Sequence, residues 1–112
     1  MSARLPRATP AWLLGFEALQ SMIAARVDGF ESEDGRLRQG DVALADTSRR
    51  FKSGDIVVCR LDGSGTMVRR LRIVGGDQAS LESGALGPPP WPVRDLSKLV
   101  VLGVVVARAG RL

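Results

Sequence analysis

Short runs rich in valine, isoleucine and leucine alternate with clusters of glycine and aspartate from residue 23 to the end of the chain. The clusters recur about every eight to twelve residues, which is the spacing of strands and turns in a small all-β domain. The runs predict strands at residues 23–28, 41–46, 55–62, 66–74, 78–83 and 99–108. A mostly β fold of short antiparallel strands is therefore expected.

Glycine and proline positions predict how these strands are connected. The sequence Asp62-Gly63-Ser64-Gly65 separates two of the runs and suits a tight reversal, because glycine readily takes positive φ values. Gly75-Gly76-Asp77 predicts a second reversal. The segment Gly84 to Pro92, with consecutive prolines at 88–90, is expected to be a loop.

The first 22 residues have a different character and are expected to form an arm before a single domain spanning residues 23–112. Pro6 and Pro10 disfavour regular structure at the start. Residues 11–22 predict a short helix, although Gly15 weakens the pattern. Its apolar residues recur at intervals of three and four: Trp12, Leu13, Phe16, Leu19 and Ile23.

Composition excludes several kinds of site. The chain has no histidine and one cysteine, which rules out a Ser-His-Asp triad, a haem ligand pair, a zinc site and an internal disulfide. No metal and no cofactor are expected. Cys59 alternates with Val57 and Leu61, as a small core residue would. No apolar run reaches the roughly 20 residues that a membrane span needs, and no signal peptide is evident, so a cytoplasmic location is expected.

The charge of +4 is carried almost entirely by arginine, since Lys52 and Lys98 are the only lysines among 16 basic residues. A basic chain suits a polyanion, but an aromatic content of 4% offers few stacking platforms and no DNA-binding motif is present. Direct nucleic-acid binding is therefore not expected. A polyanion-binding surface remains a minor alternative, with these residues: Arg49, Arg50, Lys52, Arg70 and Arg72.

Two strands carry unusual residues. The run 99–108 is apolar on both faces, which predicts either a central strand or part of a subunit interface. In the run 66–74, Arg69 shares a face with Met67 and Leu71. A guanidinium on an apolar face needs a partner, so either a carboxylate reaches it or the face lines a cleft. The alternative is an edge strand on which Arg69 extends its head into water.

Several short motifs occur along the chain in a fixed order and spacing. They are Gly40-Asp41 with Val42-Ala43-Leu44, Ser53-Gly54-Asp55 with Ile56-Val57-Val58, Asp62-Gly63, Thr66-Met67-Val68-Arg69-Arg70-Leu71, and the closing run Val101–Val106. Over residues 23–112 the chain resembles the C-terminal serine peptidase domain shared by LexA, UmuD and many phage repressors. The resemblance implies a small, strongly curved β domain of the LexA and signal-peptidase type.

The resemblance also implies a position for the nucleophile. In the family, a serine lies eight or nine residues before the first Gly-Asp, in a pattern of the form Val-x-Gly-Asp-Ser-Met. The segment Val27–Ser32 has this spacing, and Ser32 is taken as the match. The dipeptide Ser21-Met22 is too far upstream and is expected to be unrelated. Glu33 then stands where the family usually has methionine.

At the general-base position the chain departs from the family. Relatives have a lysine at the first basic position of Val-Lys-Arg, whereas this chain has Arg69. An arginine keeps its proton even when desolvated and cannot act as the base. Lys52 and Lys98 do not match that position and are expected to be exposed. The acidic residues Glu31, Glu33 and Asp34 offer either a carboxylate base or a partner for Arg69, and pairing is favoured.

Two functions follow from the resemblance. The first is a catalytically silent domain that dimerises through its C-terminal strand region and binds a protein partner in the DNA-damage response or in phage regulation. The second is an active serine hydrolase or self-cleaving peptidase with Ser32 as nucleophile and an unusual base. Since only 31 residues precede Ser32, the chain is expected to correspond to an already trimmed form without a DNA-binding domain.

Overall fold

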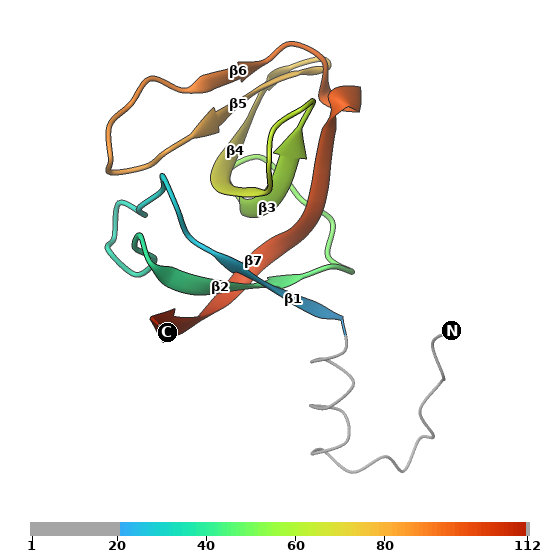
Figure 1. Ribbon diagram of the computed structural model, residues 1–112. Helices are drawn as coiled ribbons and strands as arrows, with labels where there is room; N and C mark the ends of the chain where they lie inside the picture. The colour runs from blue at the N-terminus through green and yellow to red at the C-terminus, as the bar shows by residue number, and fades with distance from the viewer. Residues whose placement is uncertain (1–20, 112) are drawn as a thin grey trace, which may run out of the picture.

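The computed structural model describes residues 21–111 of the chain, with side chains described as far as residue 109 (Figure 1). Its seven strands form one sheet in the order β1-β2-β7-β3-β4-β5-β6, and all neighbouring strands are antiparallel. The strands are β1 (Met22–Arg26), β2 (Asp41–Asp46), β3 (Ile56–Leu61), β4 (Met67–Gly75), β5 (Gln78–Glu82), β6 (Trp91–Val93) and β7 (Leu99–Arg111). A 3-10 turn, η1 (Leu96–Lys98), precedes β7. The predicted mostly β fold is confirmed.

All six predicted strands are present, with ends shifted by at most a few residues. The prediction of an unbroken loop from Gly84 to Pro92 is wrong, because Trp91–Val93 forms β6 and pairs with β5. Pro92 is tolerated there since β6 is an edge strand, whose outer side needs no backbone donor. The predicted helix at 11–22 lies outside the described residues except for its last two positions, Ser21 and Met22, of which Met22 belongs to β1.

The predicted hairpin between β3 and β4 is confirmed. Gly63 has a φ of 76°, and the amide of Ser64 donates to the carbonyl of Leu61 at 2.7 Å. The hydroxyl of Ser64 in turn accepts from the amide of Leu61 at 3.0 Å. This turn fixes the register in which Arg69 of β4 lies opposite Val57 of β3.

Strand β7 occupies the centre of the sheet, as Figure 1 shows by the way it runs past both β2 and β3. From Leu99 to Val104 it pairs with β3, and from Val104 to Arg111 it pairs with β2. Of the two alternatives for this apolar strand, the central position is therefore observed. Beyond Val104, the side of β7 that faced β3 has no strand partner within residues 21–111.

Two hydrophobic clusters stabilise the domain. The first is formed by Val57, Cys59, Leu71, Ala79, Leu81, Val93, Leu99 and Val104. The second is formed by Val27, Phe30, Leu37, Ala43, Ala45, Val58 and Val68. Strand β7 joins them, because Val104 belongs to the first while Val105 packs against the second. Cys59 is fully buried, as predicted, and burial raises the pKa of its thiol to about 11.

Candidate active site

Ser32 lies in the loop that joins β1 to β2, residues 27–40. The base of this loop is closed by the amide of Val27, which donates to the carbonyl of Asp41 at 2.8 Å. Its apolar side chains Val27, Phe30 and Leu37 are buried in the second cluster. The loop is also tied to the residues after β5, because Glu31 accepts from the amide of Ala85 at 2.7 Å. Main chain and core packing thus hold the serine in place.

The hydroxyl of Ser32 is engaged within its own loop. Its side chain is buried, and Oγ donates to Oδ1 of Asp34 at 2.7 Å. Oγ also accepts from the amide of Leu37 at 3.0 Å. The amide of Arg36 and the hydroxyl of Ser32 hold the pKa of Asp34 below its usual value. Because a lowered pKa makes a carboxylate a weaker base, Asp34 is poorly suited to remove the serine proton.

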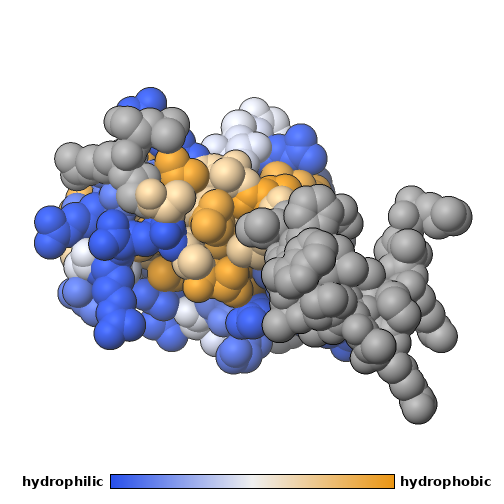
Figure 2. Space-filling model, turned by 90° about the horizontal axis from the view of Figure 1, so that it is seen from below, coloured by the Kyte–Doolittle hydropathy of each residue, from blue (hydrophilic) through white to orange (hydrophobic). Residues whose placement is uncertain are grey.

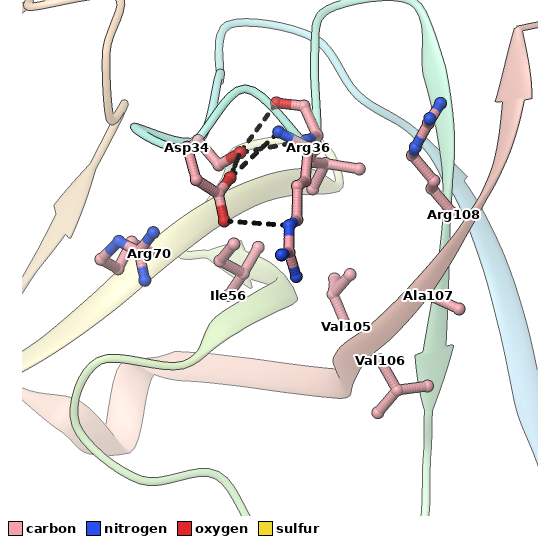
Figure 3. Close-up of a pocket in the computed structure, with 10 residues that line it drawn as sticks. Asp34, Arg36, Ile56, Arg70, Val105, Val106, Ala107 and Arg108 are labelled. Carbon is pink, nitrogen blue, oxygen red and sulfur yellow. Dashed lines mark hydrogen bonds and ion pairs between the residues drawn. The ribbon is translucent and has the colours of Figure 1, made fainter.

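Ser32 faces an open groove of about 520 Å³ between its loop and the second half of β7 (Figure 3). The residues that line this groove are Ser32, Asp34, Arg36, Leu37, Ile56, Arg70, Val105, Val106, Ala107 and Arg108. In Figure 3, Arg36 extends toward the space between Ile56 and Val105. The groove therefore combines an apolar floor with three guanidinium groups. Arg70 is among them and Arg69 is not.

Arg69 is held on the other face of β4. Its Nη1 donates to the carbonyls of Asp28 at 2.9 Å and Val68 at 2.7 Å. Its guanidinium packs so closely on Gly29 that a Cβ built there would lie 2.7 Å from Nη2. The favoured pairing of Arg69 with a carboxylate is thus wrong, as is the edge-strand alternative, since β4 lies between β3 and β5. Backbone carbonyls satisfy this charge instead.

The structure does not bring the two predicted site residues together. Every hydrogen bond of Ser32 stays within residues 32–37, and those of the Arg69 side chain reach only Asp28 and Val68. Neighbouring residues of a strand project to opposite faces, so the groove that contains Ser32 receives Arg70. Ser32 as nucleophile and Arg69 at the base position remain predictions from the resemblance, and no hydrogen bond joins the two side chains.

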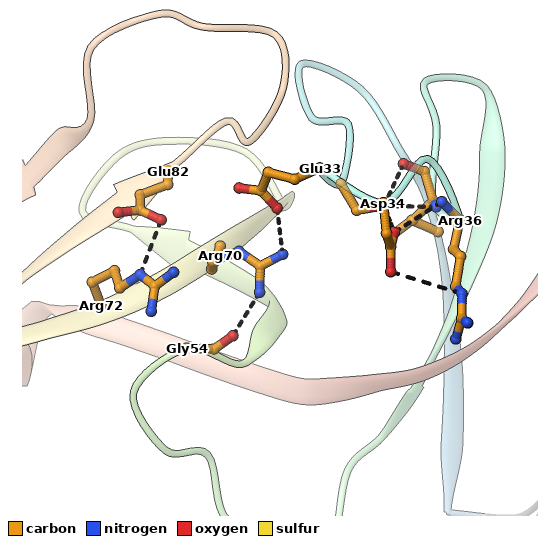
Figure 4. A network of polar contacts seen from close by, with 9 residues as sticks. Glu33, Asp34, Arg36, Gly54, Arg70, Arg72 and Glu82 are labelled. Atoms are coloured by element: carbon orange, nitrogen blue, oxygen red, sulfur yellow. Dashed lines mark hydrogen bonds and ion pairs between the residues drawn. The ribbon is translucent and has the colours of Figure 1, made fainter.

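The acidic residues near Ser32 pair with other arginines (Figure 4). Arg70 donates from Nη2 to Glu33 at 2.8 Å and from Nη1 to the carbonyl of Gly54 at 2.8 Å. Arg72 pairs with Glu82 at 3.1 Å. Three of the five cations considered for polyanion binding, Lys52, Arg70 and Arg72, therefore already have a carboxylate partner. The two lysines are largely exposed, as predicted, and lie 3.6 Å (Lys52) and 4.0 Å (Lys98) from aspartate oxygens.

Sequence reasoning missed a second position for the nucleophile. When the pattern Val-x-Gly-Asp-Ser-Met is counted from Val27 and Gly29, its serine falls on Glu31, and Ser32 is one residue later. Glu31 follows closely on Gly29, against which Arg69 packs. Aligning the glycine of the family pattern with Gly29 is enough to find this position from the sequence. In that register the chain has glutamate and arginine where the family has serine and lysine.

The small all-β domain of seven antiparallel strands is consistent with the fold of the LexA-type serine peptidases. The sequence profile of the Peptidase S24-like family matches residues 6–106, and the chain belongs to this family. This confirms the resemblance to the LexA and UmuD peptidase domain. A search of curated proteins gave no match.

Residues 21–111 contain no group of three histidine, cysteine, aspartate or glutamate side chains arranged to hold a metal ion. Within the same residues, no helix is long and apolar enough to span a membrane.

Proposed function

We propose that this chain is a catalytically silent member of the Peptidase S24-like family that dimerises and binds a protein partner, in the DNA-damage response or in phage regulation. The proposal is carried by Arg69, which the resemblance matches to the general-base lysine and whose side chain donates to the carbonyls of Asp28 and Val68. A guanidinium has five donors and no lone pair to accept a proton. Its donor role supports a structural function for the position.

The alternative is an active serine hydrolase that uses Ser32 with an unusual base. Asp34 is the group that accepts the Ser32 proton in a hydrogen bond at 2.7 Å. Its lowered pKa makes it a weak base, and the amide of Leu37 occupies a lone pair of the same hydroxyl. These contacts favour the silent function over the hydrolase.

An activated phosphonate tests the proposal directly. We expect the folded wild-type chain to gain no phosphonate mass at mildly alkaline pH, because Ser32 has no competent base. Intact-mass spectrometry measures the result, and an established serine hydrolase treated in parallel shows that the reagent is active. Stoichiometric labelling that peptide mapping assigns to Ser32 would instead establish the hydrolase.

The dimer surface that we propose is the outer face of β1, β2 and β7. Ala43 and Ala45 of β2 point into the second cluster, so alternation places Val42 and Leu44 on the opposite face. Leu44 lies opposite the exposed Ala24 of β1 and also opposite Ala107 of β7. Figure 2 shows apolar side chains gathered on this side of the molecule. An exposed apolar area over the C-terminal strand suits association with a second copy.

A charge on this face is expected to prevent dimerisation. We expect wild type to sediment as a dimer, and Ala24→Glu to sediment as a monomer at the same concentration, because the introduced carboxylate would be desolvated in the interface. Val74→Glu, at a position 70% exposed near the other end of the sheet, is the matched control and should leave the dimer intact. Circular dichroism verifies that both variants fold. A wild-type monomer at high concentration would contradict this surface.

A further inference from the structure

The wall of the groove formed by β7 is a strand edge. Four consecutive residues, Val105–Arg108, line the groove, whereas one face of a strand would contribute only alternate residues. This is also the stretch in which β7 has left β3 and pairs only with β2. In an antiparallel ladder, alternate residues direct their N–H and C=O groups to one neighbour and the residues between them to the other. The groove side of Val105–Arg108 therefore presents backbone groups without a strand partner in the described chain.

The opposite wall leaves this edge open. It is formed by the loop residues 32–37, whose main-chain hydrogen bonds close on themselves: Ser32 donates to Leu37 at 2.8 Å, and Gly35 donates to Ser32 at 3.0 Å. Ile56 and Leu37 supply apolar surface between the two walls. A volume of about 520 Å³ lies within the range of sites that bind ligands, about 300–1,000 Å³. An extended peptide can add as a strand to such an edge.

The charges of the groove define the chemistry of that peptide. Its lining contains Arg36, Arg70 and Arg108 against one carboxylate, Asp34. The side chains of Arg36 and Arg108 are 89% and 55% exposed, and their described ion-pair contacts are long, at 3.8 and 3.9 Å. Hydrogen bonds to oxygen are shorter than this, so both guanidinium groups keep donors for a further carboxylate.

We propose that this groove binds an extended acidic peptide of a partner protein, which pairs with Val105–Arg108 as an added strand. Carboxylates of the peptide bind Arg36 and Arg108, and an apolar side chain between them packs on Ile56. The inference rests on the proposed function, since it names the kind of partner that a silent family member would bind. The groove shares Ala107 with the outer face around Ala24 and Leu44, but its arginines and Ile56 are not part of that face.

A fluorescein-labelled peptide of alternating glutamate and valine tests this binding by fluorescence anisotropy. We expect the full chain to bind it at least tenfold more tightly than the same peptide with lysine for glutamate, and more weakly as salt rises. Arg36→Gln combined with Arg108→Gln should weaken binding at least tenfold. Arg94→Gln, another exposed arginine outside the groove, is the control and should bind as wild type.

A second probe separates strand addition from simple charge attraction. The same peptide with alternate N-methylated amides keeps its carboxylates but lacks half of its backbone donors, so we expect its binding to be lost in at least one of the two methylation registers. Unchanged affinity for both methylated peptides, or equal affinity for the lysine peptide, would overturn the inference. The same results are expected if a second copy of the chain, and not a peptide, pairs with this edge. Mass spectrometry of the bound peptide gives an independent outcome. Cleaved peptide would overturn catalytic silence while leaving peptide binding intact.

Discussion

We expect the double variant Glu31→Ser with Arg69→Lys to be labelled stoichiometrically by an activated phosphonate, although the wild-type chain and both single variants remain unlabelled. Counted from Gly29, these two changes place serine and lysine at the positions that the family pattern gives to nucleophile and base. The main chain at residue 31 is held by hydrogen bonds to Ser83 and Ala85, so a serine there would be fixed. Alternation places a lysine at position 69 on the strand face of Met67 and of the buried Leu71, and apolar surroundings favour the neutral form of an amine.

The single variant Arg69→Lys decides whether Ser32 or Glu31 is the position that matches the family's nucleophilic serine. If Ser32 is the nucleophile, this single variant gains the label on Ser32, and the assignment to Glu31 is wrong. If only the double variant is labelled, the chain has lost both catalytic groups but kept the scaffold. Intact mass, peptide mapping and a thermal unfolding curve for each variant provide the readouts. An unlabelled, folded double variant would show that the scaffold itself no longer supports the chemistry.

Replacing Gly84 by alanine is expected to destabilise the domain by more than about 3 kcal/mol, which exceeds the usual effect of a single substitution. Gly84 has a φ of 65°, and a Cβ at this position would collide with the carbonyl oxygen of Glu31 and crowd the ring of Phe30. Both neighbours are fixed, since that carbonyl accepts from Ala85 and Phe30 is fully buried. Relief would require breaking the contact between the β1–β2 loop and the residues after β5.

Gly87→Ala is the matched control for this prediction. Gly87 has a φ of 85°, but a Cβ there would meet nothing within 4 Å. We therefore expect Gly87→Ala to lower the free energy of unfolding only by the cost of the left-handed backbone conformation, about 1–2 kcal/mol. Urea denaturation followed by circular dichroism gives both free energies of unfolding. Equal losses for the two variants would show that the close approach of Glu31 and Gly84 does not stabilise the domain.

The strands could be predicted from the sequence because their cause is local. Residues 41–46 were placed correctly since their apolar run ends in polar turn residues on both sides. Strand β6 was missed because prolines precede it and Pro92 lies within it, and only pairing with β5 makes it a strand. The central place of β7 was one of two alternatives that its two apolar faces predicted, but the change of partner at Val104 depends on how the whole sheet twists.

The candidate site was predicted less completely, because it depends on how a loop covers a strand. Alternation alone places Arg69 and Arg70 on opposite faces of β4. It does not show over which face the 27–40 loop closes, and hence which arginine lies beside Ser32. The ion pair between Glu33 and Arg70 joins residues 37 positions apart, a distance at which no spacing rule operates. In contrast, the residue type alone showed that Arg69, at the position matched to the family's lysine, cannot act as a general base.

The placement of β7 also has a consequence for biosynthesis. The ribosome makes this strand after the other six, yet it contributes Val104 to one hydrophobic cluster and Val105 to the other, and it separates β2 from β3 in the sheet. While it is still inside the exit tunnel, the emerged strands are β1 paired with β2 and the group β3 to β6, which no strand joins into one sheet, so each group has an unsatisfied edge. Such intermediates are prone to aggregate and are natural substrates for chaperones. This domain is therefore expected to become protease-resistant in one late step, when β7 emerges.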